Sequence, residues 1–260
     1  MLHYKTFLKT EKEDWVVFIH GAGGSSSIWF KQLKDFRANF NVLLIDLRGH
    51  GGSKNFLEKY VKQDYTFKDV SRDVLEVLDH LKIKSGHFVG ISLGCLIIRT
   101  IGEIAPDRIK SMVLGGAITR LNIRSNILMH GGNILKRVVP YIWLYSLFAW
   151  VIMPKKRHKV ARSMFIEEAK RLAQKEFLKW YKLTAEVNPL LKYFREKELF
   201  IPTLYIMGEE DYMFLPPVKN IVSRHRMASL EILLNSGHVV NVDKPELFNS
   251  ISIDFIKKNY

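Results

Sequence analysis

The sequence predicts an α/β fold with a mostly parallel central sheet, helices on both of its faces and one helical lid insertion. Two observations support this fold class. Short apolar, β-branched runs alternate with segments of helical periodicity, which is typical of parallel strands connected by helices. The alternation stops once, between about residues 119 and 197, where the chain becomes basic, aromatic and helical in period.

The expected strands follow from the apolar runs. Polar and apolar residues alternate over residues 1–9, which predicts an edge strand and lacks the continuous apolar stretch of a secretory signal. Six apolar runs predict further strands at 15–19, 42–45, 87–91, 109–114, 204–207 and 230–234. Helical connectors are expected at 28–37, 67–81, 93–104, 217–226 and 245–258. Pro217 and Pro245 suit the first turns of the last two helices, where the missing N–H costs nothing.

The insertion divides the chain into a core and a lid. We expect residues 1–118 and 198–260 to form the core and residues 119–197 to form a helical lid that folds over the strand ends. The longest apolar run, 138–153, contains Pro140 and is shorter than the roughly 18 to 20 residues that cross a bilayer. This run is therefore interpreted as a pair of lid helices.

Composition and charge exclude several classes of protein. Hydrophobic residues make up 47% and charged residues 25% of the 260 residues, which argues against disorder and against a multi-span membrane protein. The net charge is +14, and 17 Lys or Arg against six Glu and no Asp lie between Arg120 and Glu198. No nucleic-acid-binding motif accompanies this charge, so we expect no nucleic-acid partner. A single cysteine, Cys95, forms no intramolecular disulfide, so a cytoplasmic location is expected.

The strongest local signal is the stretch Gly90-Ile91-Ser92-Leu93-Gly94, which lies between an expected strand and an expected helix. A serine at such a tight turn is held in a strained conformation that exposes its hydroxyl at the strand end, and the flanking glycines avoid clashes. The alternative is a glycine-rich packing turn with an incidental serine. The strand-turn-helix context favours a nucleophile.

A serine nucleophile needs a base and an orienting carboxylate. Of nine histidines, only His238 lies in a glycine-flanked loop between the last expected strand and the last helix. Asp211 follows the strand at 204–207 and should therefore lie at the same edge of the sheet, with Glu209 and Glu210 as weaker alternatives. The resulting order of Ser, Asp and His is that of the α/β-hydrolases.

A glycine-rich turn, His20-Gly21-Ala22-Gly23-Gly24-Ser25, follows the first core strand. Consecutive glycines let backbone N–H groups turn toward a developing oxyanion. The turn lacks the spacing of a phosphate loop or of a dinucleotide site. Acyl transfer through a covalent serine intermediate needs neither an organic cofactor nor a metal, so we expect neither.

Five motifs together resemble the signatures of the bacterial α/β-hydrolase superfamily, close to its carboxylesterase-like members. They are residues 20–23, Asp46-Leu47-Arg48-Gly49-His50-Gly51-Gly52-Ser53, residues 90–94, Gly208-Glu209-Glu210-Asp211, and Gly237-His238 followed by Lys244-Pro245-Glu246-Leu247-Phe248. The resemblance covers nearly the whole chain except the lid. It implies that Ser92 is the nucleophile, His238 the general base and then acid, and Asp211 the orienting acid. The N–H groups of Ala22 and Leu93 are implied to form the oxyanion hole, and the motif at 46–53 to be structural.

Several readings of this site remain open from the sequence. The first is an esterase or related acyl hydrolase that forms an acyl-Ser92 intermediate on a small substrate with an apolar acyl group. The alternatives are a ligand-binding or signalling protein with slow turnover, and a carbon-carbon bond hydrolase or lyase that uses the same residues. Cys95 follows the serine turn, but is interpreted as a small buried packing residue.

The lid contains a dense group of aromatic residues within the apolar run at 138–153. Apolar side chains at helical spacing need a surface to cover, and the nearest is the sheet edge that carries Ser92. We therefore expect Trp143 and Phe148 to line an apolar acyl pocket. The basic residues of the lid would then face solvent and give, at most, a weak association with an anionic membrane surface.

Overall fold

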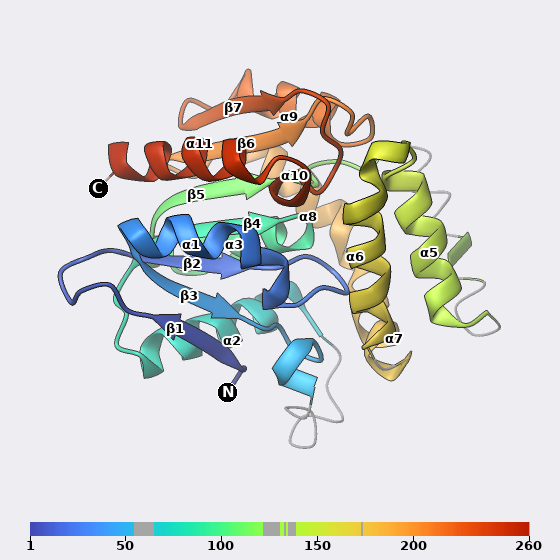
Figure 1. The fold of residues 1–260 in the computed structure, drawn as a ribbon, viewed down its shortest axis with the longest axis horizontal. Helices are drawn as coiled ribbons and strands as arrows, with labels where there is room; N and C mark the ends of the chain where they lie inside the picture. The colour runs from blue at the N-terminus through green and yellow to red at the C-terminus, as the bar shows by residue number, and fades with distance from the viewer. Residues whose placement is uncertain (55–64, 122–130, 133, 135–138, 173, 260) are drawn as a thin grey trace.

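The computed structural model describes residues 1–54, 65–121, 131, 132, 134, 139–172 and 174–259 (Figure 1). A seven-stranded sheet runs through the centre, in the order β1-β3-β2-β4-β5-β6-β7. β1 pairs antiparallel with β3, and the other neighbours pair in parallel. The strands are β1 (Tyr4–Phe7), β2 (Trp15–Ile19), β3 (Asn41–Ile45), β4 (Gly86–Ile91), β5 (Ile109–Gly115), β6 (Thr203–Gly208) and β7 (Ala228–Leu233). The predicted edge strand and the six predicted apolar strands are all present.

Helices cover both faces of this sheet. One face packs against α1 (Phe30–Asn39) and α11 (Pro245–Lys258), and the other against α2 (Phe67–His80), α3 (Leu93–Ile104) and α9 (Leu215–Val222). The central strands are buried on both sides because alternate side chains serve opposite faces: Val16 and Phe18 belong to one core, whereas Val17 and Ile19 belong to the other. The predicted α/β class is therefore confirmed.

Helix boundaries agree with the expected periodicity, with two differences. The helix expected at 217–226 begins and ends earlier, because the residues from Ser223 onward form the turn that leads into β7. Within the described residues, the apolar run at 138–153 forms one helix, α5 (Tyr141–Ile152), and not a pair. Pro140 precedes α5 instead of interrupting it, since proline is tolerated at the start of a helix.

The segment between β5 and β6 continues with further helices. They are the short helix η4 (Lys156–His158), then α6 (Lys159–Lys170), α7 (Gln174–Lys182) and α8 (Thr184–Glu196). In Figure 1, α5, α6 and α7 lie beyond the tips of the strand arrows, with α6 nearer to the sheet than α5. In the described ranges, no helix is both long enough and apolar enough to cross a membrane.

Parallel strands bring their carboxyl ends to one edge of the sheet. β4, β6 and β7 all end at this edge, and the segments that follow them carry Ser92, Asp211 and His238. Helices α5, α6 and α7 of the segment between β5 and β6 lie beyond the same edge (Figure 1), whereas α8 packs against α3. The topology thus gathers the predicted site residues beneath the insertion.

Candidate active site

Ser92 occupies the turn between β4 and α3. Its backbone has φ of 54° and ψ of −116°, a conformation that residues other than glycine rarely adopt. Such strain costs on the order of 1 to 3 kcal/mol and persists only where the surroundings enforce it. Here the Ser92 N–H donates to the Gly115 carbonyl of β5 over 3.0 Å, which anchors the turn to the neighbouring strand.

Position 94, just after the serine turn, has no room for a side chain. A Cβ at this position would lie 2.3 Å from the Ile19 carbonyl oxygen and 2.8 Å from that of His20. The first turn of α3 therefore packs directly against the backbone at the end of β2. This close approach brings Ser92 next to the glycine-rich turn that follows β2, as the motif predicts.

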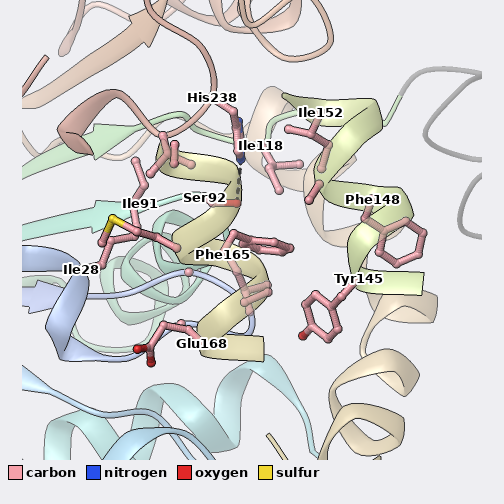
Figure 2. A pocket seen from close by; sticks show the side chains of 18 of the residues that line it. Ile28, Ile91, Ser92, Ile118, Tyr145, Phe148, Ile152, Phe165, Glu168 and His238 are labelled. Atoms are coloured by element: carbon pink, nitrogen blue, oxygen red, sulfur yellow. Dashed lines mark hydrogen bonds between the residues drawn. The ribbon is translucent and has the colours of Figure 1, made fainter. Parts of the chain in front are cut away.

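The three predicted catalytic side chains form one hydrogen-bonded chain. Ser92 Oγ lies 2.9 Å from His238 Nε2, and His238 Nδ1 lies 2.8 Å from Asp211 Oδ2. Asp211 and His238 are buried, and Asp211 Oδ1 also accepts the N–H of Phe214 over 3.3 Å. Figure 2 shows the Ser92 and His238 side chains pointing toward one another. The arrangement holds a hydroxyl, an imidazole and a carboxylate in line.

The two alternative carboxylates contact other groups. Glu209 is exposed and accepts the backbone N–H of Asn235 over 3.2 Å. Glu210 lies 2.7 Å from Lys155 Nζ and 2.8 Å from His158 Nε2, so it binds the turn that links α5 to α6. Although partial burial opposes ionisation, these hydrogen bonds lower the pKa of Glu210. Both carboxylates therefore bind groups outside the Ser92–His238 pair.

The glycine-rich turn lies beside Ser92 and contributes backbone N–H groups. Ala22 and Leu93 both line the cavity next to the Ser92 side chain. Among the described residues, neither of these N–H groups has a backbone or side-chain acceptor. Leu93 is the first residue of α3, so its N–H is one of the donors that an α-helix leaves unpaired. Two donors are therefore available near the hydroxyl of Ser92.

The motif at 46–53 supports this turn through the buried His50, which lies beside the buried His20 of the turn itself. The Gly23 N–H donates to His50 Nε2 over 3.1 Å, and His50 Nδ1 donates to the Arg48 carbonyl over 2.8 Å. Burial, assisted by the neighbouring His20, lowers the pKa of His50 to about 3, so the ring is neutral and can accept this N–H. His20 Nδ1 donates in turn to the Gly21 carbonyl over 2.8 Å.

Asp46 links the same motif to the short helix Ser26–Trp29, which follows the glycine-rich turn. Its carboxylate accepts the N–H of Ser26 over 2.7 Å and that of Gly52 over 2.9 Å. The sequence predicts only a structural loop here. The structure adds what the loop supports, namely the backbone of Gly23 and Ser26, which follow Ala22. The polar side chains of the motif were the signal that the sequence offered.

A cavity of about 230 Å³ opens beside Ser92 and is lined almost entirely by apolar side chains (Figure 2). Phe148 lines it, as predicted, together with Tyr145 of the same helix and Phe165 of α6. Trp143 does not: the prediction is wrong for this residue, which lies on the exposed face of α5. Successive residues of a helix are about 100° apart, so Trp143 and Phe148 project from different sides.

Tyr145 connects α5 to the glycine-rich turn. Gly23 has φ of +67°, and a Cβ there would lie 2.8 Å from the Tyr145 ring. Burial raises the pKa of the Tyr145 hydroxyl, so it remains protonated. Tyr145 is not among the residues that the sequence predicts to line the cavity, because α5 is apolar around its whole circumference and its sequence does not show which side is buried.

Glu168 gives the cavity one acidic end. Its Oε2 accepts a hydrogen bond from Ser25 Oγ over 2.8 Å, and its Oε1 lies 3.0 Å from Arg171 Nη1. Figure 2 shows the Glu168 carboxylate at the end of α6 furthest from His238. The cavity is thus apolar beside Ser92 and polar at its far end.

Two further predictions concern groups near the site. Cys95 is buried, and its thiol donates to the Gly115 carbonyl over 3.4 Å. Burial raises the pKa of this thiol, which disfavours the reactive thiolate and agrees with a packing role. Across the described ranges, no cluster of three or more His, Cys, Asp or Glu side chains has the arrangement of a metal site.

Comparisons with known proteins agree with this fold. The family model described as "alpha/beta hydrolase fold" matches residues 14–131. RutD of Acinetobacter baylyi is 26% identical over 98% of this chain and 98% of its own length. The 3-oxoadipate enol-lactonase 1 of the same organism is 26% identical over 93% of this chain and 88% of its own length.

The fold also matches solved structures over nearly its full length. The enol-lactonase from Burkholderia xenovorans LB400 superposes with a TM-score of 0.81 at 22% identity, over 98% of this chain and 96% of that one. The matched family model, the near-complete coverage and the serine turn after a parallel strand all agree with the resemblance deduced from the five motifs. The comparisons thus bear out the resemblance of this chain to the bacterial α/β-hydrolase superfamily.

Proposed function

We propose that this protein is a serine hydrolase that cleaves an ester-type acyl bond through an acyl-Ser92 intermediate. The observation that carries the proposal is the chain from Ser92 through His238 to Asp211, with spacings of 2.9 and 2.8 Å, at the wall of an apolar cavity. Hydrogen-bonded spacings of this kind are what proton transfer from a serine to a histidine requires.

The geometry supports a two-step acyl transfer. His238 Nε2 accepts the Ser92 proton while Oγ forms a bond to the acyl carbon, and the substrate oxygen becomes an oxyanion near the N–H groups of Ala22 and Leu93. The C–O bond to the leaving alcohol then breaks, and His238 gives the alcohol its proton. Water next attacks the acyl carbon while His238 takes a proton from it. The bond from Ser92 Oγ to the acyl carbon then breaks, His238 returns the proton to Oγ, and the carboxylic acid leaves. Asp211 stabilises the imidazolium throughout.

The cavity supports a small substrate with an apolar acyl group. Its lining near Ser92 includes Phe148, Phe165 and Ile118, and about 230 Å³ holds a short chain more readily than a long one. Relatives named as enol-lactonases act on lactones, which are cyclic esters. The substrate of this chain is thus proposed as an ester or a lactone.

Residues 119–197 are proposed to form a helical lid. Residues 1–118 and 198–260 are proposed to form the core that this lid covers. Two contacts support this role: Tyr145 and Phe148 line the cavity, and Glu210 of the core binds the turn after α5. The single cysteine is consistent with a reducing, cytoplasmic location.

A panel of p-nitrophenyl esters from acetate to laurate tests the proposal. The wild type should turn over at least the short esters, and Ser92→Ala should lower kcat by on the order of 10⁴ to 10⁶ while leaving the thermal melt unchanged. Ser27→Ala is the matched control, since Ser27 also lines the cavity but binds Ser25 instead of a histidine. It should retain kcat within about threefold.

Two outcomes would overturn the proposal. Full activity in a well-folded Ser92→Ala protein would remove Ser92 from the chemistry. Saturable ester binding with negligible turnover in the wild type would instead favour the ligand-binding alternative.

A further inference from the structure

Helix α5 is apolar on every side although one of its sides faces solvent. None of its residues, Tyr141–Ile152, carries a charge. The inner side is explained, because Tyr145, Phe148 and Ala149 line the cavity. A helix that is apolar all round is normally buried or spans a membrane. With 12 residues, α5 is too short to span one.

The outer side of α5 forms an exposed apolar stripe, which we call the α5 outer face and define as Trp143, Leu147 and Trp150. These residues are spaced by four and three positions and are 68%, 48% and 55% exposed. Residues at this spacing lie on one side of a helix. In Figure 1, α5 lies at the edge of the molecule, with α6 between it and the sheet. Contiguous exposed apolar surface of this kind usually marks an interaction site.

A group of positive charges adjoins this face. The turn after α5, which we call the basic turn and define as residues 155–159, contains Lys155, Lys156, Arg157 and Lys159. Arg162 in α6 stacks its guanidinium 3.6 Å from the centroid of the Trp150 ring. Between residues 140 and 162, the sequence contains five Lys or Arg and no Asp or Glu.

Part of this charge remains available to a ligand. Lys155 and Arg157 are partly neutralised by Glu210. Lys156 and Lys159 are exposed, and the described part of the chain records no acidic partner for either of them. The free positive charges therefore lie just beyond the end of α5 that carries Trp150.

We propose that the α5 outer face and the basic turn dock on an anionic lipid surface. Tryptophan and leucine side chains beside lysine and arginine are the composition of helices that lie in the headgroup region of a bilayer. Tryptophan suits this region because its ring is apolar and its N–H is polar. Docking would immerse the outer face of α5 while its inner face continues to line the cavity.

The charge disfavours a second copy of the chain as the occupant. Two copies that met face to face about a twofold axis would bring their basic turns into one interface, and like charges there oppose association. An anionic surface instead attracts each such lysine by an amount that corresponds to about fivefold in affinity.

Vesicle binding by the full-length chain tests the proposal without any substrate. The protein should co-sediment with phosphatidylcholine vesicles that contain about one-quarter phosphatidylglycerol, and much less with pure phosphatidylcholine. Raising salt from about 0.05 M to about 0.5 M should release it. Because no turnover is measured, the result is independent of Ser92 chemistry.

Matched variants separate this surface from general stickiness. Lys156→Gln with Lys159→Gln should weaken binding about 30-fold, whereas Lys257→Gln with Lys258→Gln should change it by less than about threefold. The control pair lies at the end of α11, at the opposite side of the molecule (Figure 1).

Trp143→Ala should weaken binding about tenfold. Phe200→Ala should have little effect, although Phe200 is 87% exposed, because it precedes β6 at the other edge of the sheet. Equal binding to neutral and anionic vesicles would overturn the proposal, as would equal losses in the matched variants. A dimer in light scattering that Trp143→Ala dissociates would assign the surface to a second copy.

Discussion

Phe148→Ala tests whether helix α5 forms a wall of the acyl pocket. The Phe148 side chain lines the cavity beside Ser92, whereas Trp143 of the same helix lies on the outer face. Truncating Phe148 widens the cavity and leaves part of a bound acyl chain in contact with water. The expected effect is therefore a change in chain-length preference and not a uniform loss of activity.

The size of the effect follows from the area that each methylene buries. Complete burial contributes about 0.8 kcal/mol per methylene, which corresponds to about fourfold in kcat/KM. From acetate to hexanoate, four methylenes should raise the kcat/KM of the wild type by up to about 200-fold. If Phe148→Ala halves the area buried per methylene, each is worth about twofold, and the same series should rise only about 16-fold.

The assay compares kcat/KM for p-nitrophenyl esters of increasing length in the wild type, Phe148→Ala and Trp143→Ala. Trp143→Ala is the matched control and should follow the wild-type series, because its side chain lies outside the cavity. A uniform loss across all lengths in Phe148→Ala would mean that the ring only holds α5 in place. A flattened series in Trp143→Ala would refute the assignment of the two faces.

Two further predictions concern the groups behind Ser92. Asp211→Asn should lower kcat by about 10⁴ through loss of the carboxylate that orients His238. Glu209→Gln should change kcat by less than about threefold. If Glu209→Gln instead lowered kcat as much as Asp211→Asn is expected to, the orienting acid would have been misassigned. His50 has a pKa of about 3 in the folded chain and about 6.5 when exposed, so its contribution to stability is complete above pH 6.5 and is lost as the pH falls toward 3. Urea unfolding should show a slope from this group of up to about 1.4 kcal/mol per pH unit in that window, and His50→Gln should reduce the slope; equal slopes would contradict the neutral, buried ring.

The strands of the core were predictable because parallel strands buried on both faces read as continuous apolar runs. All six predicted apolar strands are present in the structure, with boundaries that differ by a few residues. The number of helices in the apolar run at 138–153 was not predictable in the same way. Pro140 is compatible with an interruption or with a helix start, and only the surrounding structure decides between them.

The candidate site was predictable at positions where the backbone geometry requires a particular residue type. Ser92 needs the glycine at position 94 because α3 approaches the end of β2, and this requirement is visible in the sequence. The inward side of α5 was not visible, because a helix without polar residues has no apolar stripe to define its orientation. For this reason the sequence grouped Phe148, which lines the cavity, with Trp143, which lies on the outer side of the helix.

The central claim is that Ser92 is the single acylated nucleophile of this protein. Intact-protein mass spectrometry after treatment with a fluorophosphonate tests it most directly, because a serine activated by His238 is phosphonylated and an ordinary serine is not. The wild type should gain the mass of one adduct, mapped by peptide sequencing to Ser92, and Ser92→Ala should gain none. An unmodified wild type, or an adduct that persists in Ser92→Ala, would contradict the account.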